Sequence, residues 1–161
     1  DWISLRNTAM LNLMSRAGLR VGEVTTLRAD DMEINQRSGW VSIRSGKGNK
    51  ARRVPLNVEV RAALAAYLKT GRSSSDALFT SKTGQPLSNR DVQRLVADLA
   101  RRAGVQNVSP HTLRHTFATR AVEKGIDLAT VSAMLGHSRL ETTGRYLHPT
   151  AERMEEAVEG I

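Results

Sequence analysis

The chain of 161 residues contains no cysteine. This absence excludes a disulfide framework and zinc–thiolate sites, and it is compatible with a reducing cytoplasm. No apolar run approaches the length needed to cross a bilayer, and no signal peptide is visible. Aromatic residues make up only 4% of the chain, so we expect a core built mostly from Leu, Val, Ala and Met.

Acidic residues are outnumbered by basic ones. The chain has 24 Lys and Arg against 16 Asp and Glu, a formal net charge of +8. Residues 150–161 hold four Glu and one Arg, so the rest of the chain is more basic than the total. This balance is typical of a protein with a polyanionic partner, most simply nucleic acid, although a soluble basic protein without such a partner has the same composition.

The hydrophobic periodicity predicts a mainly α chain with one small antiparallel β-sheet, an α+β fold of a single domain over residues 1–161. The segment "WVSIRSGKGNKARRVPL" alternates on both sides of a Gly-rich turn and predicts a β-hairpin. The segment "ALFT" is a candidate short strand. Asn57, Ser88, Ser109 and Asp127 are candidate helix caps. Together with glycines and the apolar spacing they predict helices over residues 2–17, 21–28, 58–69, 89–103, 110–124, 128–135, 139–147 and 150–159.

One of these helices begins with an unusual cluster of side chains. In "SPHTLRHTF", Ser109 and Pro110 suit the N-cap and first helical positions, and His111, Arg114 and His115 then fall within about one turn. Free backbone N–H groups at such a helix end bind anions, so a phosphate suits this corner. The alternative is a buried structural histidine beside a solvated arginine. The HxxxH spacing is only a weak zinc signal without the Glu of HExxH.

Further motifs follow the order known from one family. The chain carries "GLR" with a nearby acid, a hairpin "GKG", "HTLRH", "LGH" and "TTGRYLH". This ordered set resembles the tyrosine recombinases, the phage integrase family, over residues 5–150. The resemblance implies the tyrosine recombinase catalytic-domain fold and DNA strand cleavage and rejoining. Integrases and other site-specific recombinases of mobile elements share this chemistry.

The resemblance also implies roles for individual residues. Tyr146 matches the nucleophile that forms a 3′-phosphotyrosyl bond, and Lys47 matches the general acid for the departing 5′-oxygen. Arg20 and Arg114 match the arginine pair that stabilises the pentacoordinate phosphate. His111 matches the residue assigned to help deprotonate the tyrosine.

Two supporting positions and one further catalytic position complete the set. His137 matches the second phosphate-contacting residue of the family. Glu23 matches an acid that orients the site, and His115 resembles an adjacent buried histidine with a supporting role. Four basic groups around one phosphate could replace the electrostatic work of a metal ion, so we expect no metal and no cofactor.

Basic residues near the hairpin and the tyrosine are candidates for contacts with the DNA backbone. If the strand after the hairpin turn is regular, Arg52 and Arg53 point to opposite faces. The alternative for each basic residue is simple solvation. These candidates are Arg44, Lys50, Arg52, Arg53 and Arg145.

We expect double-stranded DNA as partner, no membrane, and a cytoplasmic, nucleoid-associated location. The chain begins with Asp1 rather than Met, so we expect an excised catalytic domain without the N-terminal core-binding domain of the family. The acidic tail helix within residues 148–161 packs on its own domain or on a neighbouring protomer. We expect a monomer in isolation and self-association into a synapse on DNA. The alternatives are a type IB topoisomerase-like enzyme and a non-catalytic DNA-binding module.

Overall fold

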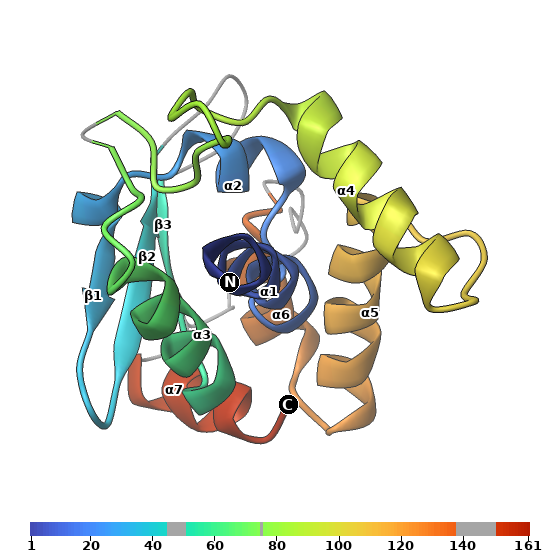
Figure 1. Cartoon of the computed structure of the whole chain (residues 1–161). Helices are drawn as coiled ribbons and strands as arrows, with labels where there is room; N and C mark the ends of the chain where they lie inside the picture. The colour runs from blue at the N-terminus through green and yellow to red at the C-terminus, as the bar shows by residue number, and fades with distance from the viewer. Residues whose placement is uncertain (45–50, 75, 138–150) are drawn as a thin grey trace.

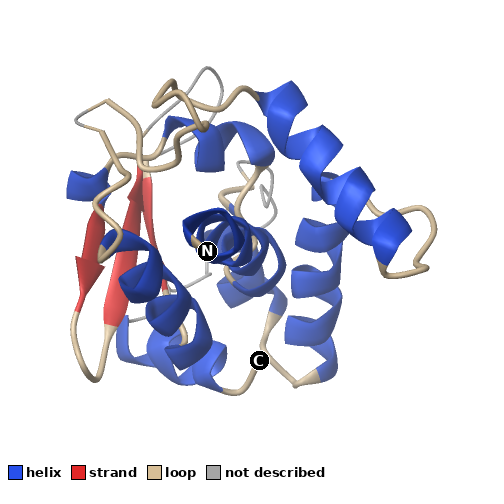
Figure 2. Cartoon of the chain, viewed as in Figure 1, coloured by secondary structure: helices blue, strands red, loops and turns tan. Residues whose placement is uncertain are grey.

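A computed structural model describes residues 1–44, 51–74, 76–137 and 151–161. Within these ranges it confirms the mainly helical fold with one small antiparallel sheet (Figure 2). The elements are, in chain order, α1 Trp2–Arg16, α2 Val21–Thr26, the 3-10 turn η1 Ala29–Asp31, β1 Met32–Ile34, β2 Gly39–Ile43, β3 Arg52–Pro55, α3 Val58–Leu68, α4 Asn89–Arg102, α5 Pro110–Glu123, α6 Leu128–Leu135 and α7 Ala151–Glu159.

Helix α1 lies at the centre of the molecule, with α3 and the sheet on one side and α4 and α5 on the other (Figure 1). The Asp1 side chain caps this helix by accepting a hydrogen bond from the Ile3 backbone N–H, 3.1 Å away. Met10, Leu13 and Met14 are fully buried because their spacing places them on the inward face of the helix. Helix α1 is therefore the support on which the other elements pack.

The predicted hairpin strands form the antiparallel pair β2 and β3, with Val41 opposite Val54. A third strand, β1, pairs antiparallel with β2 and was not predicted, because three residues are too few to display an alternation. The segment "ALFT" was expected to form a short strand, but it does not form a continuous one. That segment contributes one isolated bridge, between Thr80 and Pro86.

The capping residues predicted from the sequence begin the helices as expected. Asn57, Ser88, Ser109 and Asp127 each accept a hydrogen bond from a backbone N–H in the first turn of α3, α4, α5 and α6. Each side chain satisfies a donor that has no partner within the helix. The helix predicted over residues 139–147 lies outside the described ranges.

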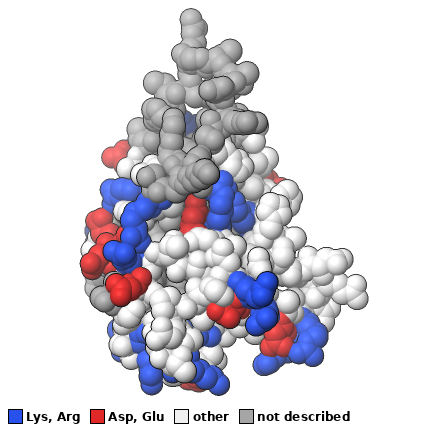
Figure 3. Space-filling model, turned by 90° about the horizontal axis from the view of Figure 1, so that it is seen from above, with Lys and Arg blue, Asp and Glu red and all other residues white. Residues whose placement is uncertain are grey.

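Charged side chains of both signs are interleaved on the face seen from above, beside the undescribed segments (Figure 3). No helix in the described ranges is long and apolar enough to cross a membrane.

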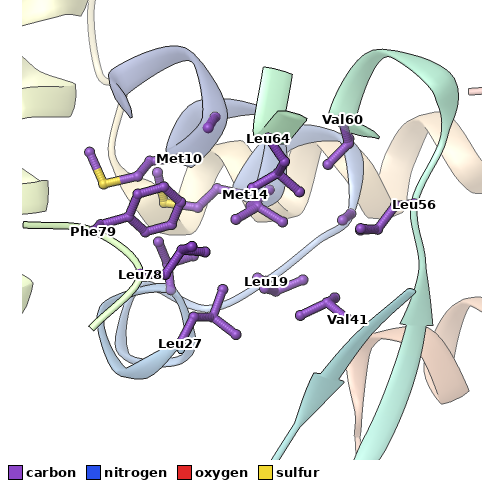
Figure 4. Packing of buried hydrophobic residues seen from close by; sticks show 14 of the residues in the cluster. Met10, Met14, Leu19, Leu27, Val41, Leu56, Val60, Leu64, Leu78 and Phe79 are labelled. Atoms are coloured by element: carbon purple, nitrogen blue, oxygen red, sulfur yellow. The ribbon is translucent and has the colours of Figure 1, made fainter. Parts of the chain in front are cut away.

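The main core fills the space between α1, α3 and the sheet (Figure 4). Tyr67 belongs to it and stacks on Phe79 with ring centroids 5.3 Å apart. Its hydroxyl donates to the Leu78 carbonyl at 3.0 Å, so its polar end is satisfied inside the core. The side chains around it are mainly aliphatic and Met, as the composition indicated.

A smaller cluster joins α5, α6 and α7. Phe117, Met134 and Val158 are buried together there, so the tail helix packs on the body of its own chain. Two polar contacts add to this packing. Glu155 accepts from the Trp40 indole at 2.9 Å, and Glu159 pairs with Arg61 at 2.7 Å. Helix α6 contacts α5 and β3, and its C-terminal end forms part of the site described next.

Candidate active site

The site begins at the N-terminus of α2, where Arg20 and Glu23 contact each other. The Glu23 carboxylate accepts a hydrogen bond from the Arg20 backbone N–H at 2.8 Å and lies 3.1 Å from the Arg20 guanidinium. An acid three residues into a helix is well placed to reach back to the residue that precedes it. This local geometry explains the spacing between Arg20 and the nearby acid.

Arg52 contributes a second cation from β3. Its guanidinium forms a two-pronged ion pair with Glu23, with N···O distances of 2.8 and 3.0 Å, and its Nε donates to the Met134 carbonyl at 2.8 Å. The Arg52 side chain is only 8% exposed. The Arg52 side chain is therefore enclosed by protein groups, whereas Arg53, the neighbouring candidate for a contact with the DNA backbone, is exposed.

Arg114 contributes a third cation from the second turn of α5 and is buried. Its two terminal nitrogens donate to the Gly18 carbonyl at 2.6 Å and to the Leu135 carbonyl at 2.9 Å. Arg20 also approaches the Leu135 carbonyl, at 3.4 Å. The carbonyls that end α6 carry the negative pole of that helix and have no partners within it, so they suit arginine donors.

Burial and mutual repulsion shape the ionisation of this cluster. Burial opposes the ionisation of Glu23, but hydrogen bonds and charge from Arg52 and Arg20 outweigh it and lower the Glu23 pKa. Burial, with repulsion from Arg20 and Arg52, lowers the pKa of Arg114 to about 10. Arg114 therefore stays charged at neutral pH, and the Glu23 carboxylate pairs with Arg20 and Arg52. The cluster therefore keeps positive charge that an anion would neutralise.

His137 lies directly after the C-terminal turn of α6 and is exposed. Gly136 ends the helix in the left-handed conformation, with φ of 68°, and the His137 backbone N–H donates to the Ser132 carbonyl at 3.2 Å. Partial burial and repulsion from Arg114, Arg20 and Arg52 lower the pKa of the imidazole. In the absence of an anion, His137 is therefore neutral at pH 7.

This electrostatic arrangement predicts the pH behaviour of His137. In the free protein its pKa should lie below 6.5, and bound duplex DNA should raise it, because a phosphate offsets the arginine charges. Since folding lowers this pKa, the unfolded state takes up the proton first, so acidification below about 6.5 should destabilise the native state. NMR titration of the imidazole, assigned with His137→Asn, measures the shift. A free-state pKa at or above 6.5 would contradict the prediction.

The two histidines of α5 are both exposed. His111 lies in the first turn, where Ser109 caps the helix by accepting from the Thr112 backbone N–H at 3.2 Å. The expectation of a buried His115 is wrong, because its side chain lies on the outer face of the helix. Its inward neighbours on α5, Arg114 and Phe117, take the positions that face the body of the protein.

The remaining candidates are placed as follows. Arg44 donates to the Thr26 carbonyl at 2.7 Å and pairs with Asp31 at 2.8 Å, while Arg53 pairs with Glu33 at 2.8 Å on the outer face. Within the described ranges, no group of three or more His, Asp or Glu side chains is arranged to hold a metal ion. Lys47, Lys50, Arg145 and Tyr146 lie outside those ranges.

Sequence reasoning missed that Arg52 belongs to this cluster. The available signal was strand alternation, because Val54 is a core residue and Arg52 precedes it by two positions on the same face. The alternation itself is confirmed, since Arg52 points inward and Arg53 outward. The carbonyls of Gly18 and Leu135, which anchor Arg114, carry no signal in the sequence.

Known proteins similar to this chain include tyrosine recombinases. Residues 1–153 match the phage integrase family. The chain is 39% identical to tyrosine recombinase XerD of Halalkalibacterium halodurans, over 97% of this chain and 54% of that protein. It is 37% identical to tyrosine recombinase XerA of Pyrococcus furiosus, over 96% of this chain and 54% of that protein.

Solved structures give the same result. A crystal structure of XerA recombinase superposes with a TM-score of 0.79 at 33% identity, covering 96% of this chain and 57% of that one. XerH recombinase bound to palindromic difH substrate, in a post-cleavage complex, gives 0.76 at 29% identity, covering 97% and 45%.

The fold is that of a tyrosine recombinase catalytic domain. The chain belongs to the phage integrase family, and the resemblance seen in its motifs is confirmed. It spans about half the length of the relatives it matches.

Proposed function

We propose that this chain is the catalytic domain of a site-specific DNA recombinase that cuts and rejoins strands through a covalent phosphotyrosyl intermediate. The observation that carries the proposal is the convergence of Arg20 and Arg114 on the Leu135 carbonyl at the end of α6, two residues before His137. The relatives named tyrosine recombinases carry the same family domain and support the same activity.

The chemistry assigned to the motifs is a transesterification without net loss of bond energy. The phenolate of Tyr146 attacks a DNA phosphorus and forms the 3′-phosphotyrosyl bond, while the bond to the 5′-oxygen breaks. Lys47 supplies the proton that turns the departing oxygen into a 5′-hydroxyl, and His111 accepts the proton of the tyrosine. Rejoining reverses these steps with a new 5′-hydroxyl as the attacking group.

The described part of the site supports the electrostatic half of this chemistry. Free tyrosine has a pKa near 10, so it needs neighbouring cations and a proton acceptor at neutral pH. Arg20 is the most accessible of the three clustered arginines, with 33% of its side chain exposed, and it retains donors that no group in the described ranges uses. We assign Arg20, Arg114 and His137 to the non-bridging phosphate oxygens, where charge accumulates in the pentacoordinate state.

Double-stranded DNA is the proposed partner, and the proposed setting is the nucleoid in the cytoplasm. Structures of XerH bound to difH, related to this chain by fold and sequence, support DNA binding. We propose one catalytic domain over residues 1–161, monomeric alone and assembled into a synapse on DNA. The tail helix α7 then leaves the contacts described above and docks on a neighbouring protomer. Arg44, Lys50, Arg53 and Arg145 remain proposed contacts to the DNA backbone.

Covalent trapping tests the proposed function. Nicked duplexes, 5′-labelled and taken from DNA flanking the gene, are incubated in EDTA with this chain in its complete gene product and run on a denaturing gel. We expect a labelled protein adduct that is absent with Tyr146→Phe, while DNA binding is unchanged. DNA binding without an adduct on any substrate would favour a non-catalytic DNA-binding module.

The same preparation separates recombination from topoisomerase activity. A recombinase exchanges strands between two duplexes and needs several protomers, so its product should rise more steeply than linearly with protein concentration. A type IB topoisomerase-like enzyme relaxes supercoils as a lone subunit. Relaxation proportional to protein concentration without exchange would favour that alternative.

A further inference from the structure

Arg52 is the side chain that connects the strand after the hairpin to both other parts of the arginine cluster. Its terminal nitrogens form the two-pronged pair with Glu23, and its Nε donates to the Met134 carbonyl. Glu23 in turn holds both the backbone and the guanidinium of Arg20. Three elements, β3, α2 and α6, therefore meet at a single guanidinium.

The turn that presents His137 is built around the same side chain. A Cβ atom on Gly136 would lie 2.8 Å from Nη1 of Arg52 and 2.9 Å from its Cδ and Cζ atoms. Gly136 also has a φ of 68°, which L-residues rarely adopt. Glycine at this position thus allows the backbone of the turn to rest directly on the Arg52 guanidinium.

Direct contact between Arg52 and DNA does not fit this geometry. The Arg52 side chain is 8% exposed, and its fork pairs with a carboxylate that is only 10% exposed, whereas the terminal nitrogens of the buried Arg114 donate to neutral carbonyls. The next residue, Arg53, is the outward-facing one, with 54% of its side chain exposed. An arginine that contacts phosphates would have to leave this buried ion pair. Breaking the pair is costly, because it leaves a buried charge without its partner.

We propose that Arg52 is a positioning residue for strand cleavage, which sets the Glu23 carboxylate that orients Arg20 and the Gly136 turn from which His137 emerges. Arg52 acts through these groups and does not touch the DNA. Lysine cannot replace it, because an ammonium offers no planar fork that reaches two carboxylate oxygens and a carbonyl together. The effect of Arg52 on strand cleavage rests on the proposed function, whereas its contacts with Glu23 and Met134 do not depend on that proposal.

The experiment compares Arg52→Lys and Arg52→Met with Arg6→Lys and Arg6→Met in the complete gene product. Arg6 is the control, because it is also an arginine with a largely enclosed side chain and donates to the Thr80 carbonyl at 2.7 Å, away from the site. Single-turnover adduct formation at saturating DNA gives the cleavage rate, and a binding titration gives Kd. The Arg52 variants should cleave roughly 10²-fold more slowly, as expected for misplaced catalytic groups, with Kd unchanged. The Arg6 variants should cleave at the parent rate.

NMR titration of His137 tests, without any DNA, whether the charge of Arg52 lies beside the imidazole. Arg52→Met removes a positive charge near the imidazole and should raise its pKa, whereas Arg52→Lys keeps the charge and should leave the pKa near the parent value. If cleavage is slow in both variants but the His137 pKa shifts only in Arg52→Met, the slow cleavage is caused by lost geometry and not by lost charge.

The outcomes that overturn the proposal are distinct. A raised Kd with an unchanged cleavage rate would make Arg52 a DNA contact, and parent-like rates in Arg52→Lys would remove its positioning role. A His137 titration in Arg52→Met that matches the parent and Arg6→Met would show that Arg52 does not lie beside the imidazole and would remove the basis of its positioning role. If the parent forms no adduct, the proposed function fails, while the titration still decides whether Arg52 lies beside His137.

Discussion

The Glu23→Gln variant is expected to unfold with a free energy roughly 3–5 kcal/mol below that of the parent, as when one partner of a buried ion pair is removed. The carboxylate is 10% exposed and pairs with Arg20 and Arg52, while Arg114 lies close enough for its pKa to respond. Glutamine has nearly the same shape but no charge, so the buried guanidinium of Arg52 would be left uncompensated. Chemical denaturation at pH 7 measures the difference.

Glu33→Gln is the matched control for this variant. Glu33 also forms an ion pair with an arginine, Arg53, at 2.8 Å, but both side chains are more than half exposed. Such surface pairs contribute about 0–1 kcal/mol, so this variant should stay close to the parent. Equal losses of stability in the two variants would contradict the role of Glu23 as the buried partner of the arginines. A loss of stability only in Glu23→Gln would support that role.

The effect of Glu23→Gln should also depend on pH in a definite direction. Folding lowers the Glu23 pKa below its ordinary value of 4.5, so the unfolded state takes up the proton first. The stability that the carboxylate contributes is therefore complete above about pH 4.5 and is lost as the pH falls through the folded-state pKa. The difference between parent and variant should narrow on acidification. A difference that widens toward low pH would show that another group is responsible.

The Gly136→Ala variant is expected to lose strand cleavage by roughly 10²-fold through displacement of Arg52 and His137. An added Cβ atom would approach the Arg52 guanidinium to within 2.8–2.9 Å, and Arg52 is held by Glu23 and the Met134 carbonyl. Either the guanidinium or the turn must move. The left-handed backbone adds a cost of about 1–2 kcal/mol for a residue with a Cβ.

Gly104→Ala separates the cost of the left-handed backbone from the close contact with Arg52. Gly104 has a φ of 70°, nearly the same as the 68° of Gly136, but an added Cβ atom there meets nothing within 4 Å. Both variants should therefore lose stability through the backbone, and only Gly136→Ala should lose cleavage. The measurements are adduct formation under single-turnover conditions and thermal unfolding of both proteins. Slow cleavage in Gly104→Ala would indicate a general loss of structure as the cause.

Local interactions made much of this fold predictable from the sequence. The helices that begin at Asn57, Ser88, Ser109 and Asp127 were expected because each cap bonds to a backbone group only three residues away. The β2–β3 pair was expected because its strands alternate on both sides of a turn. The three-residue β1 was missed because it forms only by pairing with β2.

The sequence by itself determined the family, the order of its motifs and the identity of the residues at Arg20, Glu23, Arg114 and His137. Only the tertiary structure decided that Arg52 faces inward, that His115 faces outward, and that the end of α6 anchors the arginines. The physical reason is that these features depend on pairs of groups 21 to 115 residues apart, such as Arg114 with Leu135 and Arg20 with Leu135. The position of a buried arginine is decided by the carboxylate and carbonyls that the folded chain brings next to it. These partners lie far away in the sequence, so the spacing of the motifs does not reveal them.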